Sequence, residues 1–312
     1  MINKESIILS HVRASTQTRC RRKSFTAVSG WMFLLPALLF LLIFIFVPVL
    51  YVVYLSLLKW NLLSAHPKFV GLHNYLYLFT SRNFLQALAN TGVLSAGMLL
   101  ISLPLALFVA VLLDMRLRAT NFYRTVLFGP YVVPLVGSGL AFTLIYNKDH
   151  GVINQVLALL HVSGPDWLGN GRMAMVSVVL MSVWQYVGYY MLIFLSGLQS
   201  VPQLLKEAAA VDGAGKWRGF FTITLPSLSP SLFFALIICI IQSLQTFDQV
   251  YIMTGGGPDG ATSTLVYYIF NEGFQMYNIG TSTAASVVLL LILSLLTLVQ
   301  VKLSRRWVVD ES

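Results

Sequence analysis

The chain has 312 residues, of which 57% are hydrophobic and only 10% are charged. An ordinary soluble domain is about 45–50% apolar and about 25% charged, so a soluble fold of this length would leave a large apolar surface in water. The composition therefore indicates a protein whose solvent is largely lipid. The two cysteines, Cys20 and Cys239, suggest neither a disulfide framework nor a metal site.

Six stretches of about 20 apolar residues follow one another along the chain, and each is long enough to cross a bilayer as a helix. The first follows a basic, polar segment and is longer than the apolar core of a signal peptide, so we expect it to remain as an uncleaved membrane helix. The predicted fold is an all-α, polytopic bundle of six transmembrane helices, with spans near 31–57, 91–113, 126–146, 174–198, 230–250 and 281–303.

The distribution of positive charge predicts the orientation of this bundle. Of the 20 Lys and Arg residues, 15 fall in segments on one side of the six spans and 5 on the other. Cytoplasmic segments carry the excess of Lys and Arg in membrane proteins, so both termini are predicted to be cytoplasmic, and the net charge of +9 reflects topology rather than nucleic-acid binding. The predicted organisation is a basic tail at 1–30, a membrane domain at 31–303 and a second cytoplasmic tail at 304–312.

Proline occurs inside several of the predicted spans. It frees a backbone carbonyl and bends a helix, which suits a pathway that opens and closes, although proline is also commoner in membrane helices in general. Both interpretations remain open for Pro36, Pro48, Pro104, Pro130 and Pro134. No internal repeat is evident, which disfavours the common secondary-transporter architectures.

The cytoplasmic loop at 199–226 carries a helix–turn–helix pattern. Pro202 fits the first turn of a helix, and residues 203–211 are mostly good helix formers. Gly213 predicts the end of that helix, because glycine readily adopts the left-handed conformation found there. A second short helix is predicted over 215–223.

This elbow has features that suit contact with a soluble partner. Its alanine face, Ala208 to Ala210, is small enough for a close approach, and Phe220, Phe221 and Ile223 are apolar enough to anchor the elbow against the bundle. The alternative is an ordinary amphipathic connector in which alanine is present for helix propensity alone.

The elbow also carries a specific motif, E-A-A, three residues, G, nine residues, I-x-L-P, at Glu207, Ala208, Ala209, Gly213, Ile223, Leu225 and Pro226. In this position before the last two spans, the motif resembles that of importer permeases of the ATP-binding-cassette (ABC) class. The resemblance covers nearly everything after residue 30. The stretches Gly71–Tyr75, Met253–Pro258 and Thr262–Leu265 are similar to the binding-protein-dependent carbohydrate-uptake branch, most of all to the first of its two paired permeases.

The resemblance implies partners for this chain. In that family the elbow docks into a groove on a separate ATPase, which here implies a coupling contact through Glu207, Ala208, Ala209, Asp212 and Gly213. It implies a complex of this chain with a second permease, two ATP-binding subunits and an extracytoplasmic solute-binding protein, all assembled at the cytoplasmic (inner) cell membrane. ATP and Mg would be bound by the ATPase.

The chain itself is predicted to be no enzyme and to bind no metal or cofactor. The pair Gly215-Lys216 lacks the spacing and the following Ser or Thr of a phosphate-binding loop. The glycine-rich stretch 255–258 lacks the lysine and lies on the outer side, where we interpret it as a turn entering an outer segment that contacts the solute-binding protein.

The fifth predicted span holds the candidate substrate pathway. Gln242, Gln245, Thr246 and Gln249 recur at three- and four-residue spacing, which places them on one face of a helix. Polar groups in a span are costly unless they meet a partner or a wet cavity, and amides and hydroxyls both donate and accept hydrogen bonds, as polyols do. The predicted pathway residues are Tyr189, Gln242, Ser243, Gln245, Thr246 and Asp248, with Trp184, Tyr186 and Tyr190 as further rings for stacking on a sugar.

Each of these residues has a structural alternative. The amides would then join neighbouring helices, Asp248 would lie at the outer interface, and the aromatic rings would form an interfacial belt. The function that the sequence favours is nevertheless that of a permease for a sugar or related polyol, namely an oligosaccharide, a monosaccharide or glycerol 3-phosphate.

Two other functional classes fit the sequence less well. An ion-driven secondary transporter would normally show paired intramembrane acids, bases or histidines, whereas Asp248 is the only carboxylate well inside a predicted span. A membrane enzyme would need a catalytic pattern that the sequence lacks. A closer alternative is an ABC permease for a non-carbohydrate solute such as an amino acid or a peptide.

Overall fold

The computed structural model describes residues 31–64, 66–115 and 119–307. The chain divides into two units, residues 1–54 and 55–312. The predicted basic tail at 1–30 and the end of the C-terminal tail, residues 308–312, lie outside the described residues.

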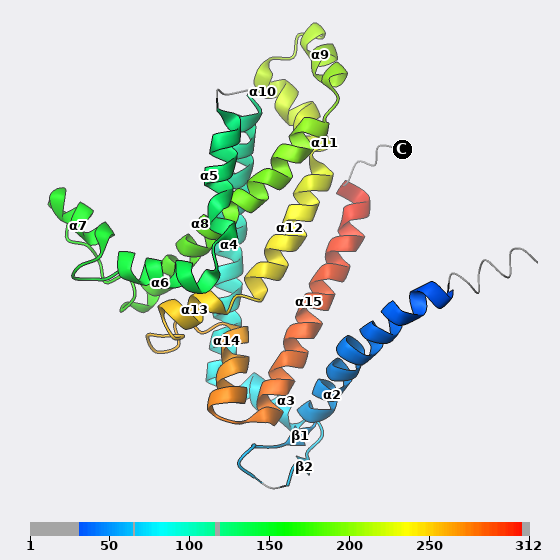
Figure 1. Cartoon of the computed structure of the whole chain (residues 1–312), viewed down its shortest axis with the longest axis vertical. Helices are drawn as coiled ribbons and strands as arrows, with labels where there is room; N and C mark the ends of the chain where they lie inside the picture. The colour runs from blue at the N-terminus through cyan, green and yellow to red at the C-terminus, as the bar shows by residue number, and fades with distance from the viewer. Residues whose placement is uncertain (1–30, 65, 116–118, 308–312) are drawn as a thin grey trace, which may run out of the picture. The chain divides into compact units, whose positions relative to one another are not determined.

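The first unit contributes the apolar helix Trp31–Ser56, which ends just inside the second unit (Figure 1). It includes a π-helical turn, Leu42–Phe46, followed by α2, Val47–Ser56. Residues 31–51 are exposed and largely apolar around the whole circumference, as in a helix whose solvent is lipid. The helix continues through both of its prolines, Pro36 and Pro48.

The second unit begins with a pair of short strands and a short helix on the predicted outer side. Strand β1 (Leu58–Lys59) pairs antiparallel with β2 (Lys68–Phe69), and helix α3 (His73–Thr80) follows. The carboxamide of Asn74 donates to the carbonyls of Ser56 and Leu58 at 2.7 and 2.9 Å. A buried carbonyl needs a hydrogen-bond donor, and Asn74 supplies one to both of these carbonyls. The two bonds therefore hold α3 against the preceding segment.

Three long helices form the frame of this unit: α4 (Arg82–Asp114), α8 (Gly171–Ser200) and α15 (Ile279–Trp307). Helices α4 and α8 pack along each other, and their side chains build the larger hydrophobic core with α12. A second core at the outer end joins α3, α4, α14 and α15 around Phe84, Leu265 and Tyr268. With 33 residues, α4 is roughly 50 Å long and extends well beyond a hydrocarbon layer of about 30 Å.

Two of the predicted spans are bent pairs of helices. Helices α5 (Thr120–Val132) and α6 (Leu135–Ile145) meet at 96°, and the helical segment Trp217–Ser227 meets α12 (Ser229–Leu244) at 64°. The first bend falls at Val133-Pro134, where the residue before a proline avoids the helical conformation. The buried carboxamide of Gln185 donates to the carbonyls of Pro130 and Val133 at 2.5 and 3.0 Å, and so satisfies the chain at the break.

The predicted all-α fold is confirmed. Among the described residues, four helices are long and apolar enough to cross a membrane, and the two bent pairs raise the number to six. The remaining helical elements are α7 (Val152–Leu159), α9 (Gln203–Val211), α10 (Lys216–Gly219), a π-helical turn (Phe220–Thr224), α11 (Leu225–Ser227), α13 (Asp248–Met253), α14 (Leu265–Phe270) and another π-helical turn (Asn271–Gln275).

Two predicted spans differ from the structure in their continuity. The third, 126–146, is interrupted at Pro134, and the fifth, 230–250, ends as a helix at Leu244 before α13 begins at Asp248. The second interruption leaves the carbonyl of Thr246 without a helical partner, and the hydroxyl of Thr264 donates to it at 2.8 Å. A side chain 18 residues along the chain therefore completes this break, which explains why local sequence patterns did not reveal it.

Helices α5 and α8 approach so closely at Gly188 that a Cβ there would overlap the carbonyl oxygen of Leu127. We expect Gly188→Ala to force these helices apart and to lower the free energy of unfolding by about 1–3 kcal/mol. Gly92→Ala in α4 is the matched control, because its added methyl group meets no atom within 4 Å. Thermal unfolding of both variants in detergent measures the difference, and equal melting temperatures would contradict the close packing.

Candidate functional site

The cytoplasmic elbow has the predicted helix–turn–helix form. Helix α9 ends at Val211 and is followed by Gly213 at φ 78°, and the amide of Ala214 donates to the carbonyl of Ala209 at 2.9 Å. This left-handed glycine with a six-residue hydrogen-bonded ring is the usual end of a helix that stops at glycine. The second helix runs from Lys216 through the π-helical turn to Ser227, slightly beyond the predicted 215–223.

Four of the five residues predicted to contact the ATPase lie on the surface of the elbow: Glu207, Ala208, Asp212 and Gly213. The side chain of Ala209 is only 8% exposed, and it lines a cavity of about 340 Å³ between the elbow and the inner ends of α4 and α8. Ala209 therefore packs toward the bundle. Because neighbouring positions on a helix point in different directions, the E-A-A pattern places residues on two faces.

The elbow also exposes large apolar side chains. Leu204, Val211 and Trp217 are 77%, 88% and 78% exposed. Phe221 is exposed as well and stacks on Trp217, with ring centroids 6.3 Å apart, so the prediction that it anchors the elbow to the bundle was wrong. Several large apolar side chains exposed on one surface loop are typical of an interaction site.

The polar residues at the end of α12 make hydrogen bonds within the bundle. The hydroxyl of Tyr190 donates to Oε1 of Gln242 at 2.6 Å, although either side chain had been a candidate to face the substrate. The hydroxyl of Thr246 donates to the carbonyl of Gln242 at 3.2 Å, and Ser243 is fully buried and donates to a carbonyl of its own helix. In this structure these three predicted pathway residues hold the end of the helix together.

The prediction that Gln242, Gln245, Thr246 and Gln249 share one helix face was wrong, because α12 ends at Leu244. Gln245 is exposed, whereas Thr246 and Gln249 are buried on either side of the break. Asp248 is half-buried in the first turn of α13, where a negative charge suits the positive end of the helix dipole. Gln249 is buried at the second position of α13 and interacts with the side chain of Tyr186 in α8.

The predicted aromatic residues gather around a ring that the sequence analysis missed. Tyr189 stacks on Tyr131 of α5 with centroids 4.5 Å apart and planes 12° from parallel, and Tyr186 meets the edge of the same ring. Tyr131 lies three residues before the Pro134 break, so the interrupted helix positions it. Trp184 lies apart from this group and packs against Phe142.

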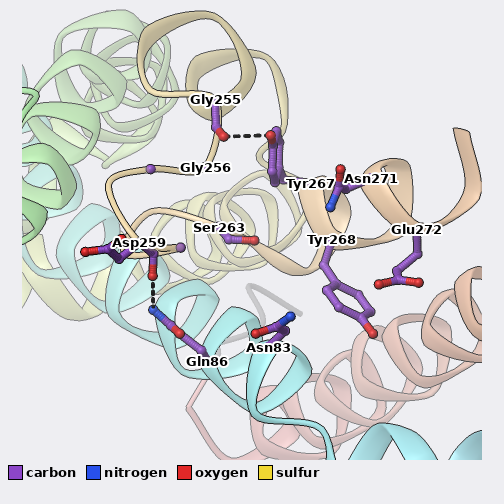
Figure 2. Close-up of a pocket in the computed structure, with 12 residues that line it drawn as sticks. Asn83, Gln86, Gly255, Gly256, Asp259, Ser263, Tyr267, Tyr268, Asn271 and Glu272 are labelled. Atoms are coloured by element: carbon purple, nitrogen blue, oxygen red, sulfur yellow. Dashed lines mark hydrogen bonds between the residues drawn. The ribbon is translucent and has the colours of Figure 1, made fainter. Parts of the chain in front are cut away.

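A polar pocket of about 310 Å³ lies at the outer end of the second unit (Figure 2). Figure 2 shows Asn83 and Gln86 of α4 on one side and the glycine-rich loop, residues 255–263, on another. The third side is the α14 segment, residues 265–275, which comprises α14 and the π-helical turn after it. The carboxamide of Asn90 donates to the carbonyls of Gly260 and Ser263 at 2.8 and 3.0 Å and fastens the loop to α4. Sequence analysis missed this pocket, although Asn83, Gln86 and Asn90 share one helix face by their spacing.

Two tyrosines complete the pocket wall. The hydroxyl of Tyr267 donates to the carbonyl of Gly255 at 2.6 Å, and its ring lies where a side chain at Gly256 would be. Burial raises the pKa of Tyr267 and of Tyr268, and the charge of Glu272 raises that of Tyr268 further. Both phenols therefore keep their protons at neutral pH.

Comparison with known structures identifies the class of fold. A bacterial alginate ABC transporter, solved in complex with an alginate pentasaccharide-bound periplasmic protein, contains a chain that superposes with a TM-score of 0.80 at 21% identity. The match covers 91% of this chain and 96% of that chain. A second structure of a transporter that imports alginate gives a TM-score of 0.79 at 22% identity. The fold is thus one found in ABC transporters.

Sequence comparison then gives the family. Residues 102–309 match the binding-protein-dependent transport system inner membrane component, and this chain belongs to that family. YurN of Bacillus subtilis, a probable ABC transporter permease, is 36% identical over 87% of this chain and 94% of its own length. The trehalose/maltose permease MalF of Thermococcus litoralis is 35% identical over 88% and 93%, and the sn-glycerol-3-phosphate permease UgpA of Agrobacterium fabrum is 35% identical over 85% and 90%.

The predicted family, fold and location are confirmed by these matches. The chain is a non-catalytic, multi-pass permease of the inner membrane, within the carbohydrate-uptake group of binding-protein-dependent ABC importers.

The bond between Tyr190 and Gln242 generates a quantitative prediction. We expect Tyr190→Phe and Gln242→Leu each to destabilise the protein, with a coupling energy of about 1 kcal/mol in a double-mutant cycle, because both changes remove the same hydrogen bond. The control cycle pairs Tyr190→Phe with Gln245→Leu, whose side chain is exposed. Unfolding in detergent is the measurement, and additive effects in the first cycle would mean that the bond contributes nothing.

Proposed function

We propose that this permease forms part of the translocation pathway for a sugar or related polyol, delivered by a solute-binding protein and driven by ATP hydrolysis in separate subunits. The observation that carries the proposal is the elbow. It exposes Glu207, Asp212 and Gly213 together with apolar side chains that the bundle leaves uncovered. Such a surface needs a soluble partner, and an ATPase subunit is the partner that this family requires.

The structure supplies a route by which that partner would act on the pathway. The second helix of the elbow ends at Ser227 and continues, through the 64° bend, into α12. Gln242 lies in the last turn of α12, and Thr246 follows two residues after the helix ends at Leu244. A displacement of the elbow would therefore be transmitted along one short chain segment to the polar residues of the predicted pathway, without an intervening loop.

The pathway residues differ in how readily they would meet a solute. Gln245 is exposed at the break after α12, and Asp248 is half-buried at the start of α13, so both are accessible in this state. Gln242 and Thr246 would become available only if the bond to Tyr190 and the break itself rearranged. Ser243, fully buried and bonded within its own helix, is the weakest candidate.

The solute class rests on two kinds of support. Relatives at about 35% identity are named for trehalose and maltose or for sn-glycerol 3-phosphate, and the candidate residues are amides, hydroxyls and a carboxylate, which suit hydroxyl-rich molecules. We propose that residues 31–303 form the permease domain, with 199–226 as the coupling loop. The full complex would contain a second permease, two ATPases that bind ATP and Mg, and an extracytoplasmic receptor.

Purification of the tagged chain in mild detergent from its native membranes tests this assembly. We expect an ATPase and a second permease to co-purify, and the receptor to bind the reconstituted complex. Uptake into vesicles of maltose, trehalose and glycerol 3-phosphate, compared with amino acids and peptides, then tests the solute. Recovery of the chain without an ATPase after crosslinking would overturn the coupling role, and uptake of amino acids alone would overturn the sugar assignment.

Gly213 provides the sharpest test of the elbow. Its left-handed conformation should strain Gly213→Val by about 1–2 kcal/mol, although the added side chain meets no atom. We expect this variant to insert normally but to lose uptake, because the strain is relieved by reorienting the exposed helix α9. Gly215→Ala is the control in the same loop, since that glycine has no left-handed φ and also meets no neighbour. Normal uptake by Gly213→Val in proteoliposomes would refute the role assigned to this turn.

A further inference from the structure

The outer pocket contains polar side chains that the fold does not use. The carboxamides of Asn83 and Asn271 and the hydroxyl of Ser263 make no hydrogen bond within the described part of the chain. Glu272 accepts from Asn278 at 3.1 Å through one carboxylate oxygen, which leaves the other oxygen available. These four residues line the same cavity from α4, the glycine-rich loop and the α14 segment (Figure 2).

The available groups match one class of ligand better than others. A carboxamide both donates and accepts, as does a hydroxyl, whereas a carboxylate only accepts. The hydroxyls of a sugar offer the same mixture at short spacing. A lysine or arginine side chain from a partner protein would only donate, and so would leave the amide donors of Asn83 and Asn271 unmatched.

The pocket walls are held in place by bonds that do not involve these groups. Asn90 and Gln86 fasten the loop to α4, and Tyr267 is fixed through its hydroxyl to Gly255. The free groups therefore stand on a preorganised frame, which reduces the entropy lost on binding. The volume of about 310 Å³ lies at the lower end of the range for small-molecule sites, about 300–1,000 Å³, and suits one or two sugar rings.

The pocket lies on the water side of the membrane rather than among the lipid tails. Helix α4 begins at Arg82, nine residues before the predicted second span at 91–113, so Asn83 and Gln86 project roughly 10 Å beyond that span. A solute released at the outer face would reach the pocket before it entered the bundle.

The charge of the pocket separates the proposed solutes. Asp259 and Glu272 are both among its lining residues, and no lysine or arginine is among them. A phosphate ester would be repelled by these carboxylates, whereas a neutral sugar would accept or donate hydrogen bonds without a charge penalty.

We propose that this outer pocket is a binding site for a neutral saccharide, in which Asn83, Ser263, Asn271 and Glu272 hydrogen-bond to sugar hydroxyls. The proposal rests on the function proposed above for the solute class, and it adds a second, extracytoplasmic site that prefers neutral sugars to glycerol phosphate. An open pocket of this kind would hold a sugar briefly between its release by the receptor and its entry into the bundle.

The test measures sugar binding to the assembled importer in nanodiscs, in the absence of receptor. Saturation-transfer NMR detects the bound sugar. The probes are maltose, trehalose and glycerol 3-phosphate. We expect saturable signals from the two neutral sugars and binding of glycerol 3-phosphate at least about tenfold weaker. Asn83→Ala and Asn271→Ala should each weaken sugar binding about fivefold, the effect of one lost hydrogen bond.

A matched control lies one turn beyond Asn271. Gln275→Ala removes an exposed carboxamide that does not line the pocket, and it should leave the affinity unchanged. Neither Asn83 nor Asn271 makes a side-chain hydrogen bond in the fold, so their variants should retain the wild-type melting temperature.

Three results would overturn the inference: no saturable binding by either neutral sugar, binding unaffected by both pocket variants, or equally tight binding of glycerol 3-phosphate. If the variants instead weakened the affinity of the importer for its receptor, the pocket would be a protein contact. Uptake by the same wild-type preparation with receptor separates this inference from the proposed function. Sugar uptake without pocket binding would refute only the pocket, whereas failure to import any sugar would refute the solute class.

Discussion

The requirement that no backbone polar group remain unpaired within lipid shapes this permease more than any other constraint. The long helices α4, α8 and α15 satisfy it internally, but the interrupted spans cannot. At the break between α5 and α6 the carboxamide of Gln185 supplies the missing donor, and at the end of α12 the hydroxyl of Thr264 does so. Both of these breaks are therefore accompanied by a buried polar side chain from another element.

This constraint complicates the assignment of polar residues to a transport pathway. A glutamine or threonine in an apolar span indicates that something polar faces it, but a backbone carbonyl or a tyrosine hydroxyl satisfies that need as well as a solute does. Gln185, Gln242 and Thr246 all have such partners here. Gln249, the fourth residue of the spacing pattern in the fifth predicted span, is buried and interacts with Tyr186 of α8.

The parts of the structure that sequence predicted are those determined locally. The elbow follows from helix propensity and from Gly213, and its form was predicted to within a few residues. Pro134 is a local signal for the break at Val133-Pro134, but nothing in the local sequence indicates that the bend is as large as 96°. The break after Leu244 depends on Thr264, and the outer pocket is closed by Asn90 contacting Gly260, 170 residues away. Such contacts depend on tertiary packing, and neither spacing nor propensity contains them.

Helix α4 connects the two ends of the molecule that the proposed function requires. Near its inner end, Val111 and Met115 line the cavity that also receives Ala209 of the elbow, and near its outer end Asn83 and Gln86 line the polar pocket. Between them the helix packs along α8 within the larger hydrophobic core, which opposes bending of α4. A shift of the elbow against the inner end of α4 would therefore tilt the same helix that carries the outer pocket. Coupling of this kind needs no contiguous chain of polar residues, only a stiff element that contacts both sites.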